Sequence, residues 1–313
     1  MRLALTWFAV AAMVAMAEGP LEVRPGGSRA PQDGPGDTSA SVLRATVNWI
    51  RIPVHVTDES GAPYAGLARA DFILAEDGVP QEVRRLAQED GPASISIVFD
   101  ASSSMKDKLG ESRAALTALF QHALPGDEYS LIEFGNEPAL RAGFTSEIAD
   151  IERAAARIHL STWTALYDAV YLGVAEARRS KNQRKAILLL SDGADNNSRY
   201  SESELRRYVR ESDVAIYSIA IRGSSRHVAA LKRLSDDTGG LSLEVQDMNG
   251  LSAAVSQLSR ALRSHYVIEY VSNRNDPARD GLYRRVELRL TPAVAALKLR
   301  LAWRHGYYTL QNF

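Results

Sequence analysis

Cysteine is absent from the 313 residues of this chain, which excludes a disulfide framework, a zinc–thiolate site and a thiol nucleophile. Neither sign of charge is in excess. Lys and Arg number 37 against 38 Asp and Glu, so no global basic field points to nucleic acid. The six histidines have no zinc-ligand spacing, and neither a Gly-x-Ser-x-Gly elbow nor a Gly-Lys-Ser/Thr phosphate loop occurs. The usual hydrolase, nucleotide-binding and zinc-binding patterns are therefore missing.

Long apolar runs are also missing, apart from one at the N-terminus. Arg2 precedes an apolar stretch of about 14 residues, shorter than the roughly 20 that span a bilayer, and small residues end it at Ala17. We predict a secretory signal peptide over residues 1–17, and hence a secreted or periplasmic protein without a membrane span after cleavage. A frayed N-terminal helix and a retained anchor are the alternatives. No cysteine follows the cleavage site, which argues against a lipid anchor.

The rest of the chain changes its hydrophobic pattern twice. Residues 18–40 are rich in Gly, Pro, Asp and Ser, which predicts a flexible linker. Residues 41–92 alternate apolar and polar side chains and include an Asp-Gly hairpin signal, which indicates an N-terminal β region. Residues 93–263 alternate apolar strands with amphipathic helices. Period two returns over 264–313, which we predict to be a C-terminal β region that pairs with 41–92.

The middle region predicts a doubly wound α/β fold. Short apolar strands between helices are typical of a mostly parallel sheet that is covered on both faces. We therefore expect a six-stranded, mostly parallel, Rossmann-like sheet, with a smaller β-sandwich formed by the flanking strands. The expected strands are 94–99, 129–134, 139–144 at an edge, 185–190, 214–221 and 241–245. The expected helices are 105–124, 147–159, 164–179, 201–211, 226–237 and 249–263. In the C-terminal region we expect strands at 265–270, 283–290 and 297–303, with a turn in "NDPARDG".

Oxygen-bearing side chains follow several of these strands. "VFDASSS" places Asp100, Ser102 and Ser104 after the first strand of the α/β region. "STWTALYDAV" places Thr164 at a helix start, and "LLLSDGADNN" places Asp192 at a strand end. Because ligands of doubly wound sheets bind outside the carboxyl ends of the strands, we expect these five to converge. Two carboxylates and three hydroxyls, without nitrogen or sulfur, suit a hard cation such as Mg²⁺, Mn²⁺ or Ca²⁺.

A purely structural role is open for each of the five residues taken alone. Ser, Thr and Asp at strand-to-helix turns are common N-caps, and Asp192-Gly193 is an ordinary turn. The combination of three loops at one sheet edge is what favours a metal site.

The five residues resemble the metal-ion-dependent adhesion site of von Willebrand factor type A domains. The resemblance covers about residues 93–262. The flanks, including "WRHGYY", resemble a bacterial, mostly secreted group of such proteins. The resemblance to the adhesion site implies that Ser102 and Ser104 ligate Mg²⁺ directly and that Asp100 and Asp192 hold it largely through waters. It also implies that Thr164 binds the ion directly or through water.

The resemblance also implies a function. The chain would be a non-enzymatic extracytoplasmic binding or adhesion module, whose protein partner supplies an acidic residue to the metal. In family members that switch, the last helix moves, here about 249–263. A structural scaffold with a merely stabilising metal site is the alternative, and a metal-dependent hydrolase is a third, which would need a nucleophile or general base near the ion.

Three further features have two interpretations each. Asp168 either orients a metal-bound water or bonds to a nearby loop. Asp195, Asn196 and Asn197 either belong to a cation site, by bordering the first or forming a second, or serve as turn and helix-cap residues. Trp163 is either an exposed contact beside the metal or packed on the next helix.

Overall fold

The computed structural model describes residues 49–89, 91–273 and 281–309. All of them belong to the second of the chain's two units, Thr46–Phe313. The predicted signal peptide (1–17) and linker (18–40) lie outside the described residues, as does nearly all of the turn predicted in "NDPARDG".

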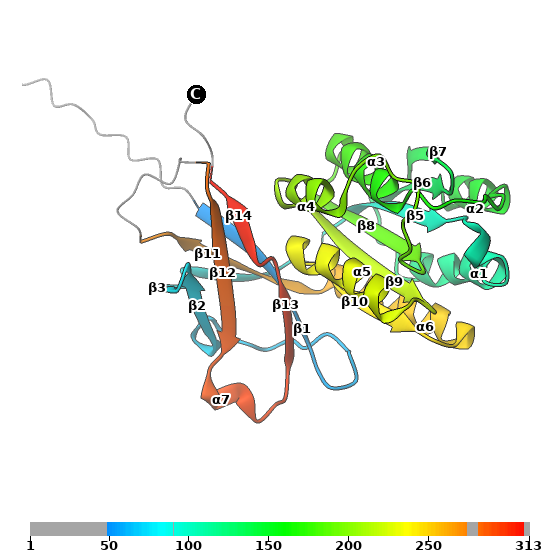
Figure 1. Cartoon of the computed structure of the whole chain (residues 1–313). Coiled ribbons are helices and arrows are strands. Elements are labelled where there is room, and N and C mark those ends of the chain that lie inside the picture. The colour runs from blue at the N-terminus through cyan, green and yellow to red at the C-terminus, as the bar shows by residue number, and fades with distance from the viewer. Residues whose placement is uncertain (1–48, 90, 274–280, 310–313) are drawn as a thin grey trace, which may run out of the picture. The chain divides into compact units, whose positions relative to one another are not determined.

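The centre of the described chain is a six-stranded sheet in the order β10-β9-β8-β5-β6-β7 (Figure 1). Every neighbouring pair is parallel except β6 and β7, so β7 is the edge strand that the sequence predicted, and it runs antiparallel. All eight residues of β5 are buried, because helices cover both faces of the sheet. The strands are β5 (Ala93–Asp100), β6 (Glu128–Phe134), β7 (Pro138–Thr145), β8 (Arg184–Ser191), β9 (Val214–Ile221) and β10 (Ser242–Val245).

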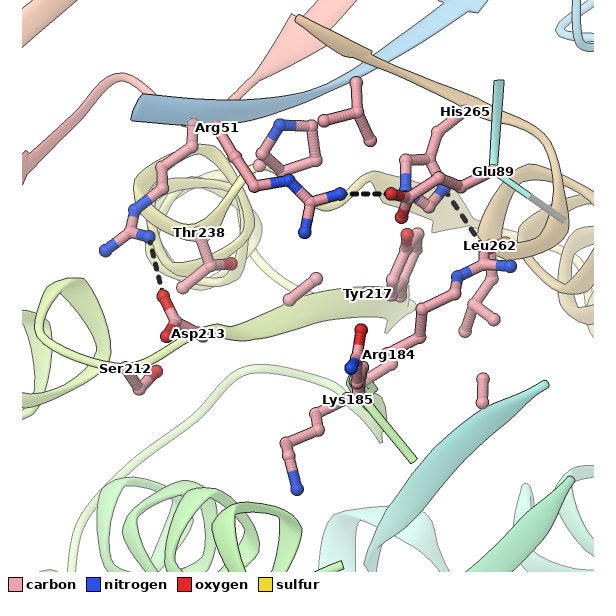
Figure 2. A pocket seen from close by; sticks show the side chains of 18 residues that line it. Arg51, Glu89, Arg184, Lys185, Ser212, Asp213, Tyr217, Thr238, Leu262 and His265 are labelled. Carbon is pink, nitrogen blue, oxygen red and sulfur yellow. Dashed lines mark hydrogen bonds and ion pairs between the residues drawn. The ribbon is translucent and has the colours of Figure 1, made fainter. Parts of the chain in front are cut away.

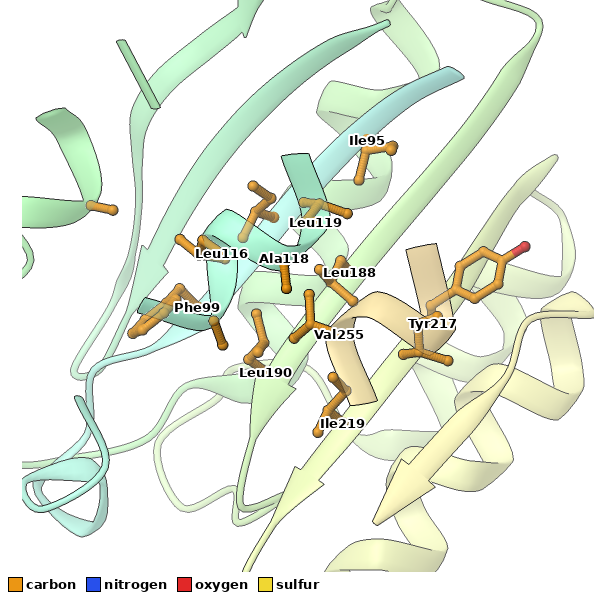
Figure 3. Packing of buried hydrophobic residues seen from close by; sticks show 14 of the residues in the cluster. Ile95, Phe99, Leu116, Ala118, Leu119, Leu188, Leu190, Tyr217, Ile219 and Val255 are labelled. Carbon is orange, nitrogen blue, oxygen red and sulfur yellow. The ribbon is translucent and has the colours of Figure 1, made fainter. Parts of the chain in front are cut away.

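Two sets of helices cover the two faces. One core cluster joins the sheet to α1, α2 and α6, and Figure 3 shows Leu116 of α1 and Val255 of α6 packed near Phe99 of β5. A second cluster joins the opposite face to α3, α4 and α5. The doubly wound fold predicted from the sequence is therefore confirmed. The helices are α1 (Leu109–Phe120), α2 (Ile148–Ala156), α3 (Leu166–Arg179), α4 (Glu202–Arg210), α5 (Ser225–Thr238) and α6 (Leu251–Arg263), with 3₁₀ turns η2 (Ser103–Met105) and η3 (Met248–Gly250).

The helix expected over 105–124 differs most from its prediction. The backbone N–H groups of Met105 and Lys108 donate to carbonyls three residues back, at 3.0 and 2.9 Å, so the chain first makes tight turns. The regular helix α1 then begins at Leu109. Within the described ranges, no helix combines the length and the apolar character that crossing a bilayer would require.

Two antiparallel sheets combine strands from before and after the α/β region. Their orders are β13-β1-β11-β4 and β14-β12-β2-β3, and a shared apolar core cluster packs them together. Asp77 and Gly78 have φ angles of 47° and 80° and connect β2 to β3, as the hairpin signal predicted. The strands are β1 (Trp49–Thr57), β2 (Phe72–Glu76), β3 (Val79–Gln81), β4 (Arg85–Glu89), β11 (His265–Val271), β12 (Tyr283–Leu290), β13 (Arg300–Trp303) and β14 (Gly306–Tyr308), with the 3₁₀ turn η1 (Arg69–Asp71).

The last predicted strand, 297–303, is shorter than expected. A short helix α7 (Pro292–Ala295) comes first, and β13 begins only at Arg300. Proline at the start of α7 has a φ angle that suits a first helical turn.

Candidate functional site

The first group of candidate ligands follows the carboxyl end of β5. Asp100 is fully buried, and its Oδ1 accepts a hydrogen bond from the Ser102 backbone N–H at 2.8 Å. Its Oδ2 accepts from the Ser191 hydroxyl at 2.5 Å. The Ser102 and Ser104 hydroxyls form a hydrogen bond, with 3.0 Å between their oxygens. The Asp-x-Ser-x-Ser spacing therefore turns both serine oxygens to the same side of the loop, while two donors fix the carboxylate.

The loop that carries Thr164 is tied to the first loop and to the Asp192 loop. The Ser161 N–H donates to the Ala101 carbonyl at 2.7 Å, beside the β5 end. The Thr164 N–H donates to the Asn196 side chain at 2.9 Å, and the Thr164 carbonyl accepts from the Asn196 N–H at 3.0 Å. Thr164 itself is buried, and among the described residues its hydroxyl forms no hydrogen bond. The α3 helix begins two residues later, so Thr164 is not its N-cap.

Asp192 ends the β8 segment next to a buried cation. Its Oδ1 accepts from the Ala194 N–H at 3.2 Å, and its Oδ2 lies 3.6 Å from the Lys108 Nζ. Both side chains of this ion pair are about one-tenth exposed. The Lys108 Nζ also donates to the Ile221 carbonyl at 3.2 Å, at the end of β9. The sequence analysis missed Lys108, which lies on the loop before α1 and meets Asp192 only in the folded chain.

Burial dominates the electrostatics of the site. It raises the pKa of Asp100 to about 6, against the hydrogen bonds from Ser102 and Ser191, and the negative charge of Asp192 raises it further. A carboxylate whose charge is this poorly solvated gains from a cation nearby. The two acids, held at neighbouring strand ends, therefore form a place where positive charge is favoured.

Two of the candidate oxygens have a spacing that suits a small divalent cation. Mg²⁺ binds oxygen at 2.0–2.1 Å in an octahedron, so two adjacent ligand oxygens should lie about 2.9 Å apart. The Ser102 and Ser104 hydroxyl oxygens meet this spacing at 3.0 Å. Nowhere in the described ranges do three or more His, Asp or Glu side chains group so that they could hold a metal. The candidate set differs from such a group because only two of its five members are carboxylates.

Asp168, Asp195 and Trp163, each of which had two interpretations from the sequence, lie in the same region. The Asp168 Oδ1 accepts from the Arg199 and Tyr200 N–H groups at 3.0 and 3.1 Å, so it bonds to the nearby loop. The Asp195 Oδ1 accepts from the Leu166 N–H at 2.9 Å, which is the predicted cap duty. The Trp163 side chain is exposed rather than packed, with an exposed fraction of 52%.

Comparisons with known proteins agree with this architecture. Residues 95–194, which contain all five candidate ligands, match the family model of the von Willebrand factor type A domain. The human inter-alpha-trypsin inhibitor heavy chain H4 is 26% identical over 201 residues, covering 58% of this chain and 22% of the human protein. The bovine protein of that name is 23% identical over 228 residues, covering 67% of this chain and 25% of its own length. The chain thus spans about a quarter of the length of these curated relatives.

Solved structures give similar matches. Proximal thread matrix protein 1 from the mussel byssus, in a structure with a zinc-occupied MIDAS motif, is 20% identical at a TM-score of 0.48. That match covers 60% of this chain and 50% of the mussel chain. A von Willebrand factor type A protein from Catenulispora acidiphila is 12% identical at a TM-score of 0.49, covering 83% of this chain and 75% of that chain. The family match over 95–194 falls within the doubly wound sheet, and this part of the chain is similar to von Willebrand factor type A domains.

Proposed function

We propose that this chain is a non-enzymatic, extracytoplasmic binding module that holds a protein partner through Mg²⁺ at Asp100, Ser102, Ser104, Thr164 and Asp192. One observation carries the proposal: the two serine hydroxyls, which hydrogen-bond to each other, hold their oxygens 3.0 Å apart, close to the edge of about 2.9 Å of a Mg²⁺ octahedron. When bound, the ion would supply an electrophilic position that a carboxylate of the partner can fill. Mn²⁺ or Ca²⁺ would suit the same oxygen set.

The protein's own groups prepare this position. The Ser191 hydroxyl and the Ser102 N–H hold the two oxygens of Asp100 in fixed directions. Lys108 balances part of the charge on Asp192. Two carboxylates balance the charge of one Mg²⁺, but Lys108 already offsets Asp192, so the occupied site would retain a demand for further negative charge. An acidic side chain of a partner meets that demand.

The loop around Thr164 offers a contact surface for the same partner. Trp163 and Leu160 have exposed fractions of 52% and 42%, so this loop presents two large apolar side chains to solvent. The Asn136 side chain holds the Trp163 N–H at 2.9 Å, so the loop is fixed while the indole faces water. Exposed tryptophans on rigid loops are typical anchors of protein interfaces. The partner is therefore an acidic segment that also presents apolar surface.

The location outside the cytoplasm is supported by the N-terminal sequence. Arg2, the apolar stretch after it and the small residues that end at Ala17 form the pattern of a secretory signal. Mass spectrometry of the protein recovered from an exporting host should find a new N-terminus after Ala17. An intact N-terminus on an exported chain would contradict this part of the proposal.

Isothermal titration of Mg²⁺ and Mn²⁺ into the metal-stripped protein tests the site. We expect saturable binding at one site, lost in Ser102→Ala and in Asp100→Asn. The matched control is Ser103→Ala. Its hydroxyl belongs to the same loop but donates to the Thr162 carbonyl at 3.2 Å, so binding should persist. If the three variants bind like the wild type, the oxygens of this loop are not the ligands.

Partner binding needs its own test. Proteins retained on the immobilised chain in Mg²⁺ should be released by a chelator, and Trp163→Ala should retain less of them while its Mg²⁺ titration stays unchanged. Retention that ignores both the chelator and Ser102→Ala would mean that the partner surface lies elsewhere.

A further inference from the structure

A hollow, which we call the Arg184 pocket, lies at the amino ends of the strands of the six-stranded sheet. The candidate metal site lies at the carboxyl ends of these strands. It has a volume of about 300 Å³ and is lined by residues at the amino ends of β5, β8 and β9. Residues of β1, β4 and β11 complete the lining, together with Arg304 after β13. Figure 2 shows Arg184, Tyr217 and His265 around this hollow, with Glu89 beside them. The pocket is thus built from both the α/β part and the antiparallel strands.

Arg184 is a partly buried cation that Glu89 and Asp127 stabilise only from beyond ion-pair distance. Its guanidinium donates to the Gly91 carbonyl at 2.7 Å, to the His265 Nδ1 at 3.1 Å and to the Leu262 carbonyl. All three acceptors are uncharged, and within the described part of the chain no carboxylate forms an ion pair with Arg184. Burial lowers the pKa of Arg184, which reflects the cost of holding this charge away from water. A partly buried charge without an ion-pair partner is stabilised when a counter-ion binds to it.

Together with burial, the positive charge of Arg184 also lowers the pKa of two neighbouring histidines. Burial and the charge of Arg184 lower the pKa of His265 to about 4. Burial lowers the pKa of His55 to about 3, and His265 and Arg184 lower it further. Both rings are therefore neutral at physiological pH and bring no charge of their own to the pocket.

Arg304 adds a second unsatisfied group to the lining. Its side chain is 13% exposed, whereas its acidic partner Asp213, 3.2 Å away, is 94% exposed and well solvated. The Arg304 Nε is buried and has no hydrogen-bond partner within the described residues. Arg51 lines the pocket as well, but Glu89 and Glu269 already engage it. The Nε of Arg304 thus lacks a partner, and Arg184 lacks a carboxylate within ion-pair distance, among the residues that the structure describes.

We propose that the Arg184 pocket binds a small oxyanion, as free phosphate or as the carboxylate or phosphate group of a small molecule, through Arg184 and Arg304. Planar guanidinium groups recognise such oxyanions in a fork-like geometry and supply charge-assisted hydrogen bonds. A volume of about 300 Å³ lies at the lower end of the range for small-molecule sites. Because its lining comes from β1, β8 and β11, a bound oxyanion ties the α/β part to the flanking strands.

The test is titration of inorganic phosphate into the full-length folded protein in chelator-containing buffer, where the metal site plays no part. Sulfate and succinate serve as further probes. We expect saturable binding at one site, weakened at least about tenfold in Arg184→Gln and in Arg304→Gln. The control is Arg199→Gln, which removes an exposed guanidinium from the loop between β8 and α4. This variant should bind phosphate as tightly as the wild type.

Arg184→Gln also breaks bonds to two backbone carbonyls, so folding of each variant is checked by circular dichroism. If Arg184→Gln does not fold, Arg304→Gln decides the question. The proposal is overturned if the wild type binds none of the three anions saturably. It is equally overturned if a folded Arg304→Gln retains full affinity, or if Arg199→Gln loses as much as the pocket variants.

Discussion

Replacing Lys108 by methionine should tighten Mg²⁺ binding, although it removes a buried contact. The ammonium lies 3.6 Å from the Asp192 Oδ2, and both side chains are about one-tenth exposed. For unit charges at this distance, Coulomb's law gives about 1 kcal/mol in water and about 4–5 kcal/mol at an effective dielectric constant of about 20. Each 1.4 kcal/mol is a factor of about ten in affinity. We therefore expect Lys108→Met to raise the Mg²⁺ affinity at least about fivefold.

The same substitution should weaken the metal-free protein. Asp192 then keeps a nearly buried charge without its partner, which costs about 1–4 kcal/mol and lowers the apo melting temperature by several degrees. Saturating Mg²⁺ should recover more stability in Lys108→Met than in the wild type. Calorimetric titration and melting curves with and without Mg²⁺ measure both effects, and Lys106→Met, an exposed neighbour, is the control.

The signs of the two effects separate this reasoning from its alternative. If Lys108 only stabilises the loop that orients Ser102 and Ser104, its loss would weaken Mg²⁺ binding together with stability. An Mg²⁺ affinity that is unchanged or lower in a folded Lys108→Met would therefore refute the electrostatic argument, whereas a wild type that binds no Mg²⁺ would refute the site itself.

Three further predictions concern stability. The folded pKa values of about 3 for His55 and about 4 for His265 lie below the ordinary 6.5, so the unfolded chain binds more protons below about pH 6.5. Stability should therefore fall between pH 7 and 5 by about 2 kcal/mol for each ring, and urea titrations of a variant with both rings replaced by Gln should show a correspondingly shallower fall. Gly240→Ala should cost about 2–3 kcal/mol, because its Cβ would collide with the Ile216 carbonyl, whereas Gly143→Ala, with open space around it, should be near neutral in the same titration. Phe99→Ala, fully buried on β5, should cost about 3–5 kcal/mol in urea unfolding, and a loss under 1 kcal/mol would contradict its place in the core.

Most of the features that were predicted correctly from the sequence have a local sequence pattern. The strands of the α/β region were predicted within one or two residues, because apolar runs that are buried on both faces leave a plain signal. The Asp-x-Ser-x-Ser pattern of Asp100, Ser102 and Ser104 could be recognised because its geometry is set within five residues. The α7 helix also had a local signal, Pro292 after Thr291, which strand periodicity in the following segment obscured.

The remaining features depend on contacts between distant parts of the chain. Ser191 meets Asp100 across 91 residues, and Lys108 reaches Ile221 across 113. The Arg184 pocket needs β8 beside β1 and β11. Hydrophobic periodicity does not predict such long-range contacts, because each of these residues also fits an ordinary local role.

The pairing of β1 has a consequence for how the chain comes into being. Its ladder partners are β11 and β13, and β4 pairs with β11 alone. During synthesis these early strands have no partner until the last sixth of the chain follows, while the α/β part between them can already collapse. A chain cut short before His265 would carry β1 and β4 with bare edges, which is the form of surface that recruits strands from other molecules. The sheet that contains β1 and β4 can therefore form only after β11 and β13 have been synthesised.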